Sequence, residues 1–126
     1  MRQTIVIPKI VLEWSEWVRW SEIEKYARLG GARIPNGVSG VYQARHADTD
    51  ECLTIGKASN LRMRIRQGLV TGKALHSAGI KIRASENTET IVVRWAITNR
   101  PAAVEEELHR LYKIKFGKYP KYTKHT

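Results

Sequence analysis

The chain has 126 residues, of which 42% are hydrophobic and 27% charged, so it fits one compact soluble domain and is too short for two. Twenty-two lysines and arginines against twelve aspartates and glutamates give a net charge of +10, which favours a polyanionic partner; a basic protein that its charge merely keeps soluble is the alternative. The single cysteine, Cys52, excludes a disulfide framework and a cysteine-based zinc site. No apolar run approaches the roughly twenty residues of a membrane span, and residues 1–10 lack a signal-peptide pattern. We therefore expect a cytoplasmic protein that does not enter a membrane.

Residues 11–29 place aromatic and apolar side chains at three-residue steps, at Trp14, Trp17, Trp20, Ile23 and Tyr26. This spacing is closest to a helical period, so it predicts one or two short helices whose aromatic stripe packs on the domain. Stacking of nucleobases on the tryptophans is the alternative. We take residues 1–36 as a helical extension packed on the domain that residues 37–126 form.

Residues 30–37, GGARIPNG, predict a loop from their glycine, proline and Asn-Gly content. The next segments, VSGVYQAR (38–45) and ECLTI (51–55), flank a polar turn at 46–50 and together predict a β-hairpin. Gly56 ends its second strand.

A helix is predicted next, because Ser59 or Asn60 can cap its start and Gly68 can end it. A second short helix is predicted within residues 71–79. The β-branched run TETIVVRWAI, at 88–97, predicts a buried central strand.

The last predicted element is a helix over residues 101–116. Asn99 and Pro101 signal its start, and Gly117 and Pro120 close it. The order of helix, hairpin, helices, strand and helix indicates an α+β fold.

The arginines of the first predicted helix are not equivalent. With about 100° between successive residues, Leu61 and Ile65 mark its buried face. Arg64 lies to one side of that face, beside the sheet, while Arg62 and Arg66 lie together on the other flank. Arg62 and Arg66 therefore suit a solvated face that grips phosphate.

The glutamates of the last helix separate in the same way. Its buried stripe is expected at Val104, Leu108 and Leu111. Glu106 then points to solvent, while Glu105 and Glu107 flank the stripe on opposite sides. Glu105 shares its side with Tyr112 and Phe116, so it can face a cleft; glutamates that only complement the helix dipole are the alternative.

Basic residues concentrate in two segments. Residues 52–85 contain seven lysines and arginines and no acid, and the stretch from Arg110 onward contains five lysines and no acid. Such segments favour contact with a nucleic-acid backbone, with an affinity that falls as salt rises. The candidate backbone-binding residues are Arg62, Arg66, Lys73, Lys81, Lys113 and Lys118.

Four short segments carry a resemblance: GVY (40–42), TIGK (54–57), NLRMR (60–64) and AAVEEELH (102–109). In order, separation and predicted elements they resemble the successive motifs of the GIY-YIG nuclease family. The resemblance covers residues 37–124. It implies a three-stranded antiparallel sheet flanked by helices, and phosphodiester hydrolysis at a single site with one divalent cation, Mg²⁺ or Mn²⁺.

The resemblance also implies residue roles. Tyr42 would help to activate water, Arg64 would stabilise charge on the phosphate, and Glu105 would hold the metal. His76 would relay a proton, although without the family pattern it reads as a helix-surface histidine, and Lys57 would contact phosphate. A tyrosine of pKa about 10 is a weak base unless cations lower that value, and Lys57 and Arg64 are the candidates for doing so.

Two positions depart from the family pattern. Thr54 stands where the second motif usually has tyrosine, and Thr123 stands where an asparagine often follows a proline. Tyr122 and Tyr112 are candidates to replace the missing phenol.

These features favour a metal-dependent DNA endonuclease whose target choice comes from DNA structure, an oligomeric arrangement or a partner protein. The alternatives are a catalytically silent nucleic-acid-binding module or assembly subunit with the same fold, and a basic RNA-binding protein.

Overall fold

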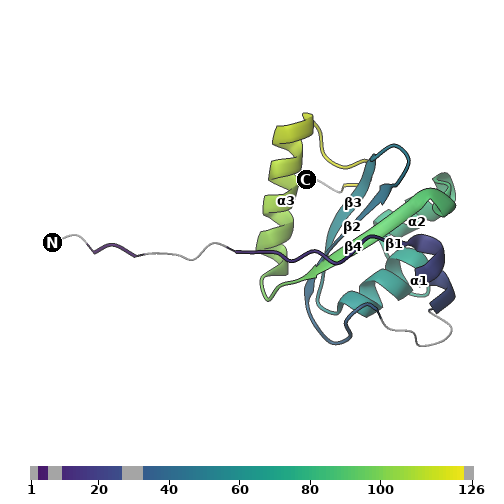
Figure 1. The fold of residues 1–126 in the computed structure, drawn as a ribbon, viewed down its shortest axis with the longest axis horizontal. Coiled ribbons are helices and arrows are strands. Elements are labelled where there is room, and N and C mark those ends of the chain that lie inside the picture. Colours follow the sequence, from purple (N-terminus) through teal and green to yellow (C-terminus); the bar gives the residue numbers. More distant parts are fainter. Residues whose placement is uncertain (1–2, 6–9, 27–32, 124–126) are drawn as a thin grey trace.

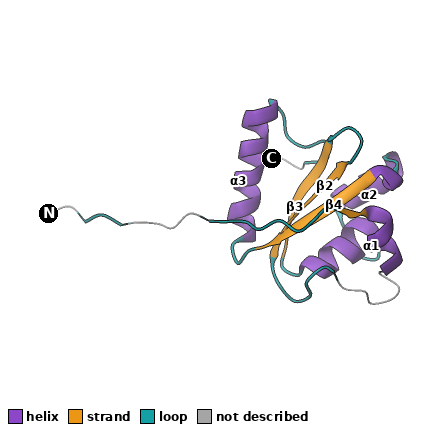
Figure 2. Cartoon of the chain, viewed as in Figure 1, coloured by secondary structure: helices purple, strands orange, loops and turns teal. Residues whose placement is uncertain are grey.

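The computed structural model describes residues 3–5, 10–26 and 33–123. The fold is α+β, as predicted, with the elements β1 (Val18–Arg19), α1 (Trp20–Tyr26), β2 (Gly40–His46), β3 (Cys52–Ala58), the π-helix η1 (Met63–Val70), α2 (Ser77–Ser85), the 3₁₀ turn η2 (Thr88–Thr90), β4 (Ile91–Ile97) and α3 (Pro101–Phe116). Helix α3 lies on one side of the sheet, and α1 and α2 lie on the other (Figure 1; Figure 2). None of the helices in the described residues is long and apolar enough to cross a membrane.

The sheet is antiparallel throughout and has four strands in the order β1-β4-β2-β3. The resemblance implied three, so the predicted strand number was wrong by one. The additional strand is β1, in which Val18 pairs with Val93 and Arg19 with Val92. Two residues are too few to show the alternation by which a strand is recognised in a sequence.

The helix predicted over residues 11–29 is confined to α1 within the described residues, and residues 27–29 lie outside them. Residues 11–17 form neither helix nor strand and run beside β4. The Ser15 N–H donates to the Trp95 carbonyl (2.8 Å), and the Trp95 N–H donates to Ser15 Oγ (3.0 Å). These tertiary hydrogen bonds supply backbone partners that a helix would otherwise provide, so they override the helical spacing of the tryptophans.

Alternating side chains of the sheet enter two separate cores. On one face, Tyr42, Ala44, Val93 and Trp95 pack in a main cluster with Leu61, Ile65 and Ile82. On the other face, a smaller cluster is formed by Val41, Ala96 and Val104, with Leu12, Trp14 and Leu108 partly buried against it. The main core therefore holds η1, α1 and α2, and the small one holds α3 and the N-terminal segment.

Helix η1 differs from the prediction in its geometry and its end. Leu61 and Ile65 are fully buried, as predicted. The Thr71 N–H donates to the Arg66 carbonyl (2.8 Å), a five-residue step typical of a π-helix. Gly68 does not end the helix, because η1 continues to Val70.

The second predicted helix begins later than expected, since α2 starts at Ser77 and His76 is its cap. The predicted hairpin and central strand are present, with different ends. Gly56 does not end the second hairpin strand, because β3 continues to Ala58. Strand β4 begins at Ile91, because residues 88–90 form η2. Helix α3 spans residues 101–116 as predicted and ends at Gly117 in the left-handed conformation (φ 74°).

The predicted buried stripe of α3 is only partly correct. Val104 is buried and Leu108 is half-buried, but Leu111 is 49% exposed. The first half of α3 packs on the sheet, while most side chains of its second half are exposed and Tyr112 is half-buried.

Candidate active site

A cavity of about 180 Å³ lies beside the edge strand β3. Its lining includes all five residues for which the resemblance implied a catalytic role: Tyr42, Lys57, Arg64, His76 and Glu105. They come from five different elements or connections, so only the folded chain brings them together. Thr54, His109, Tyr122 and Thr123 also line it.

Tyr42 lies directly across the sheet from Gly56. The two residues are cross-strand partners in β2 and β3, and the Tyr42 side chain is buried. A Cβ atom at position 56 would lie 2.3 Å from the Tyr42 hydroxyl oxygen, far inside contact distance. Because the TIG glycine has no side chain, it leaves the space that the Tyr42 phenol occupies.

His76 holds the Tyr42 hydroxyl and also caps α2. Its Nε2 lies 2.5 Å from the Tyr42 oxygen, and its Nδ1 accepts a hydrogen bond from the Gly79 N–H (2.9 Å). Because Nδ1 is an acceptor, a neutral imidazole carries its proton on Nε2 and donates it to the phenol oxygen. Burial, with further contributions from Arg64 and Arg83, lowers the pKa of His76 to about 4, so the ring is neutral at pH 7. His76 is thus buried rather than on a helix surface, and its ring is arranged to support a phenolate.

The phenol itself stays protonated at neutral pH in this environment. Burial raises the pKa of Tyr42 to about 12, and the charge of Arg64 and its hydrogen bond to the phenol act in the opposite direction. Glu105 adds a smaller upward contribution. Any further cation near this oxygen lowers the pKa toward a useful range.

Two cationic side chains line the cavity beside this pair. Arg64, from η1, is half-buried and donates from Nη1 to the Leu75 carbonyl (3.3 Å). Lys57 follows Gly56 on β3 and is exposed. Both also line a neighbouring hollow formed with Asn99 and the start of α3, so positive charge continues from the cavity to the surface.

Of the three consecutive glutamates of α3, Glu105 alone lines the cavity. It is half-buried, and no hydrogen bond or ion pair joins its carboxylate to another described side chain. Glu106 is exposed, and Glu107 pairs with Arg110 on the surface. The hydroxyl of Thr123 is also buried in the cavity lining without a hydrogen-bond partner among the described residues. An uncommitted carboxylate and an unpaired hydroxyl are oxygen donors that suit a hard divalent cation.

Two further residues line the cavity: His109, which was assigned no role from the sequence, and Tyr122, which was named only as a candidate to replace the missing phenol. The imidazole Nε2 of His109 lies 2.8 Å from the Ile55 carbonyl, and a spacing of four residues from Glu105 on one helix was the signal available for it. Tyr122 arrives because its N–H donates to the Leu53 carbonyl (2.8 Å), which lays the C-terminal segment along β3. Of the two tyrosines considered as replacements for the missing phenol, Tyr122 lines the cavity and Tyr112 does not.

The six candidate backbone-binding residues are spread over several surfaces. Arg62 donates from Nε to the Ile34 carbonyl (2.8 Å), and Arg66 lines a small hollow beside α1. Lys73 and Lys81 are exposed on the loop before α2 and on α2. Lys113 lies over the ring of Tyr119 (4.8 Å to its centroid). Lys118 lines a different hollow, together with Tyr112 and Phe116, so those two aromatic residues do not share the cleft of Glu105.

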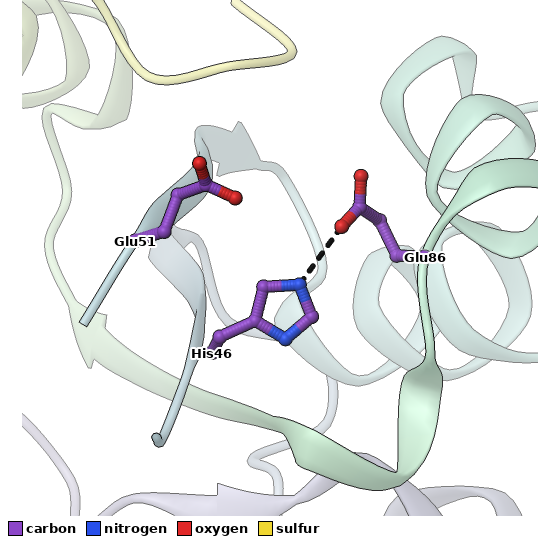
Figure 3. A group of neighbouring side chains, drawn as sticks. All are labelled: His46, Glu51 and Glu86. Atoms are coloured by element: carbon purple, nitrogen blue, oxygen red, sulfur yellow. Dashed lines mark hydrogen bonds and ion pairs between the residues drawn. The ribbon is translucent and has the colours of Figure 1, made fainter. Parts of the chain in front are cut away.

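A second group of polar side chains, His46, Glu51 and Glu86, has metal-ligand chemistry (Figure 3). Their ligand atoms lie within 4.8 Å of one another. However, both ring nitrogens of His46 are engaged, by Thr90 Oγ1 (2.7 Å) and by Glu86 (2.8 Å). The other Glu86 oxygen accepts hydrogen bonds from Lys121 Nζ (2.8 Å) and the Tyr122 hydroxyl (2.5 Å). We interpret the group as a clamp that holds the C-terminal segment beside the cavity.

Comparisons of the chain with protein-family models, with curated proteins and with solved structures give no match.

Proposed function

We propose that this protein is a divalent-metal-dependent endonuclease of the GIY-YIG type, which hydrolyses phosphodiester bonds in DNA from the cavity beside β3. The observation that supports the proposal is the gathering of Tyr42, Arg64 and Glu105 in one cavity, with His76 and Lys57 beside them. Phosphodiester hydrolysis needs an activated water, stabilisation of the extra negative charge, and a bound or protonated leaving oxygen. These five side chains supply groups for each of the three requirements.

In the proposed reaction, Tyr42 first loses its phenolic proton to solvent, and the resulting phenolate takes a proton from water. The water oxygen then bonds to phosphorus while the bond from phosphorus to the leaving oxygen breaks. The leaving oxygen takes a proton from solvent, which gives a phosphate monoester and an alcohol. The Nε2 proton of His76 stabilises the negative form of the phenol. Arg64 interacts with the phenol and lines the cavity in which the phosphate would lie, so it can lower the pKa of the first and stabilise charge on the second.

Glu105 would hold the metal, and the unpartnered hydroxyl of Thr123 in the same lining is an additional oxygen donor of the kind that a hard cation accepts. A bound Mg²⁺ or Mn²⁺ ion supplies charge stabilisation for the phosphate and for the leaving oxygen. One carboxylate suffices for such an ion, because Mg²⁺ keeps several waters and takes ligands from the substrate.

Binding of the DNA backbone rests on the net charge of +10 and on Lys57 at the cavity mouth. Contacts of this kind position the substrate and read little sequence. We therefore propose that DNA structure or a partner protein selects the target. A cytoplasmic location is consistent with the single buried thiol of Cys52.

The test is nicking of supercoiled plasmid by the purified full chain with Mg²⁺ or Mn²⁺. Glu105→Ala and Arg64→Ala should abolish nicking and leave DNA binding in place. Glu106→Ala is the matched control, since it removes the neighbouring carboxylate, which points away from the cavity. Nicking by the parent and by Glu106→Ala, together with its loss in the other two variants, supports the proposal.

Binding without nicking across both metals and across linear, supercoiled and branched DNA would overturn the enzyme proposal. That result would favour the silent nucleic-acid-binding module. The buried Thr54, in place of a second tyrosine, is the observation on the side of that alternative.

A further inference from the structure

A second and larger hollow, of about 810 Å³, lies on the opposite face of the sheet. We call it the aromatic groove and define it by Trp14, Trp17, Arg94, Tyr112, Lys115 and Phe116. The two tryptophans come from the extended N-terminal segment, and the last three residues come from the C-terminal half of α3. Arg94 comes from β4, whose alternation points it away from the Tyr42 face.

The aromatic groove holds a cation that has no ion-pair partner among the described residues, although Glu51 and Asp50, which pairs with Arg45, also line the hollow. The Arg94 guanidinium lies over both indole rings, 4.2 Å from the Trp14 centroid and 4.5 Å from that of Trp17. Its Nε donates to Gln43 (2.9 Å), and no carboxylate among the described residues pairs with it. Burial and the neighbouring Arg45 both lower the pKa of Arg94, so the fold bears a cost for keeping this charge in place. A partly buried guanidinium of this kind is satisfied by an anionic ligand.

The α3 wall of the aromatic groove presents flat aromatic surface to solvent. The rings of Tyr112 and Phe116 lie with their centroids 4.5 Å apart, and Phe116 is 53% exposed. Lys115 lies between them in sequence and is exposed. Aromatic rings interleaved with basic side chains are the usual means of binding unpaired nucleotides, since the rings stack on bases while the cations contact phosphates.

An intact duplex does not suit this arrangement. Its bases are already stacked on one another, so only its phosphates would be available to the groove, and the exposed rings would have nothing to stack on. An unpaired strand offers both its bases and its phosphates.

We propose that the aromatic groove binds a single-stranded stretch of nucleic acid, with a phosphate on Arg94 and Lys115 and a base on the Tyr112–Phe116 pair. The inference deepens the proposed function and rests on it for the identity of the polymer. It assigns as substrate a DNA that has an unpaired segment next to the site of cleavage.

The experiment measures binding of a fluorescein-labelled 15-nucleotide oligo-dT and of a 15-base-pair duplex. It uses the full chain carrying Glu105→Ala, so that no cleavage interferes. Phe116→Ala and Lys115→Glu, each added to this background, should weaken oligo-dT binding about tenfold. The duplex should respond less to Phe116→Ala, because stacking contributes nothing there.

Two matched controls use residues that do not line the aromatic groove. Ile114→Ala truncates a 69%-exposed side chain on the same helix, and Lys25→Glu reverses one exposed charge on α1. Each should change oligo-dT binding by less than about twofold. Both substituted groove residues are exposed, so the variants should fold, which thermal unfolding by circular dichroism checks.

Oligo-dT binding that is unaffected by both groove substitutions overturns the inference and indicates that the groove packs or docks a protein. Nicking of plasmid by the parent chain is measured separately. If the parent nicks DNA while the groove substitutions leave oligo-dT binding unchanged, the inference fails and the proposed function stands. Conversely, if the groove substitutions weaken oligo-dT binding but the parent chain never nicks DNA, the inference about the groove is supported and the proposed nuclease activity is overturned.

Discussion

The cavity beside β3 and the aromatic groove lie on opposite faces of one sheet, yet they are built differently. In the cavity, the Tyr42 phenol is buried and is already joined to His76 by a hydrogen bond. In the groove, Phe116 is exposed, the other rings are half-buried, and the Arg94 guanidinium has no ion-pair partner among the described residues. Chemistry requires groups held in fixed positions, whereas stacking and phosphate contact tolerate movement. Substitutions should therefore have steep effects in the cavity and graded effects in the groove.

The largest effect is expected from Arg64→Lys. This change keeps the positive charge and loses the planar fork that matches a phosphate, so the cleavage rate should fall about 10²-fold or more. DNA affinity, measured separately by fluorescence anisotropy, should change little. Arg66→Lys is the control, because Arg66 lies away from the cavity, and its cleavage rate should stay within about twofold. Similar rates for both variants would place Arg64 among the general backbone contacts instead.

Gly56→Ala should have the next largest effect. The new methyl group would displace the Tyr42 ring, which should lower the free energy of unfolding by about 1–3 kcal/mol and remove most of the cleavage activity. Urea denaturation and plasmid nicking measure the two effects. The clash is specific to the ring, so in a Tyr42→Ala background the same substitution should cost much less. Equal costs in both backgrounds would show that the phenol does not lie across Gly56.

The sequence was sufficient to predict the elements that have a strong local signal. Helix α3 has Pro101 at its start and Gly117 at its end, so its bounds were placed correctly. The hairpin strands flank a polar turn, so the hairpin was predicted, although β3 runs past Gly56 to Ala58. The order of the four motifs also predicted that Tyr42, Lys57, Arg64 and Glu105 belong to one site, because these residues lie on strands and helices with a strong local signal.

What could not be predicted depends on contacts between distant parts of the chain. The segment of Trp14 and Trp17 is extended because its backbone bonds to β4, which its own spacing does not reveal. Tyr122 reaches the cavity through pairing with Leu53, and His76 is buried because Gly68 leaves room for its ring. The aromatic groove was missed for the same reason, since its two walls are almost a hundred residues apart in sequence.

A smaller effect should appear in the pH dependence of stability through His76. Its pKa is about 4 in the folded protein, against about 6.5 when unfolded, so the unfolded state binds the proton first. The stabilisation is complete above pH 6.5 and is lost as the pH falls toward 4, by about 2–3 kcal/mol. His76→Asn keeps an acceptor for the cap of α2 and does not titrate, so its free energy of unfolding should vary less in this window. Urea denaturation from pH 4 to 7 compares the two, and parallel curves would contradict a buried neutral imidazole.

The smallest effect concerns Glu86, which holds the C-terminal segment beside the cavity and touches neither hollow. Hydrogen bonds from Lys121, Tyr122 and His46 lower the pKa of Glu86 to about 2, so its contribution to stability is complete above about pH 4.5 and is lost as the pH falls toward 2. Because Lys121 is largely solvated, Glu86→Gln should cost only about 1–2 kcal/mol at pH 7.

The local consequence of Glu86→Gln should be clearer than the global one, because hydrogen exchange of the Tyr122 amide should accelerate once the clamp is weakened. Glu51→Gln is the matched control, since Glu51 belongs to the same group but its carboxylate joins no described side chain (Figure 3). Faster exchange in Glu86→Gln alone supports the clamp. Equal acceleration in both variants would instead indicate a metal site, provided that Zn²⁺ slows exchange of the Tyr122 amide in the parent and does not slow it in either variant.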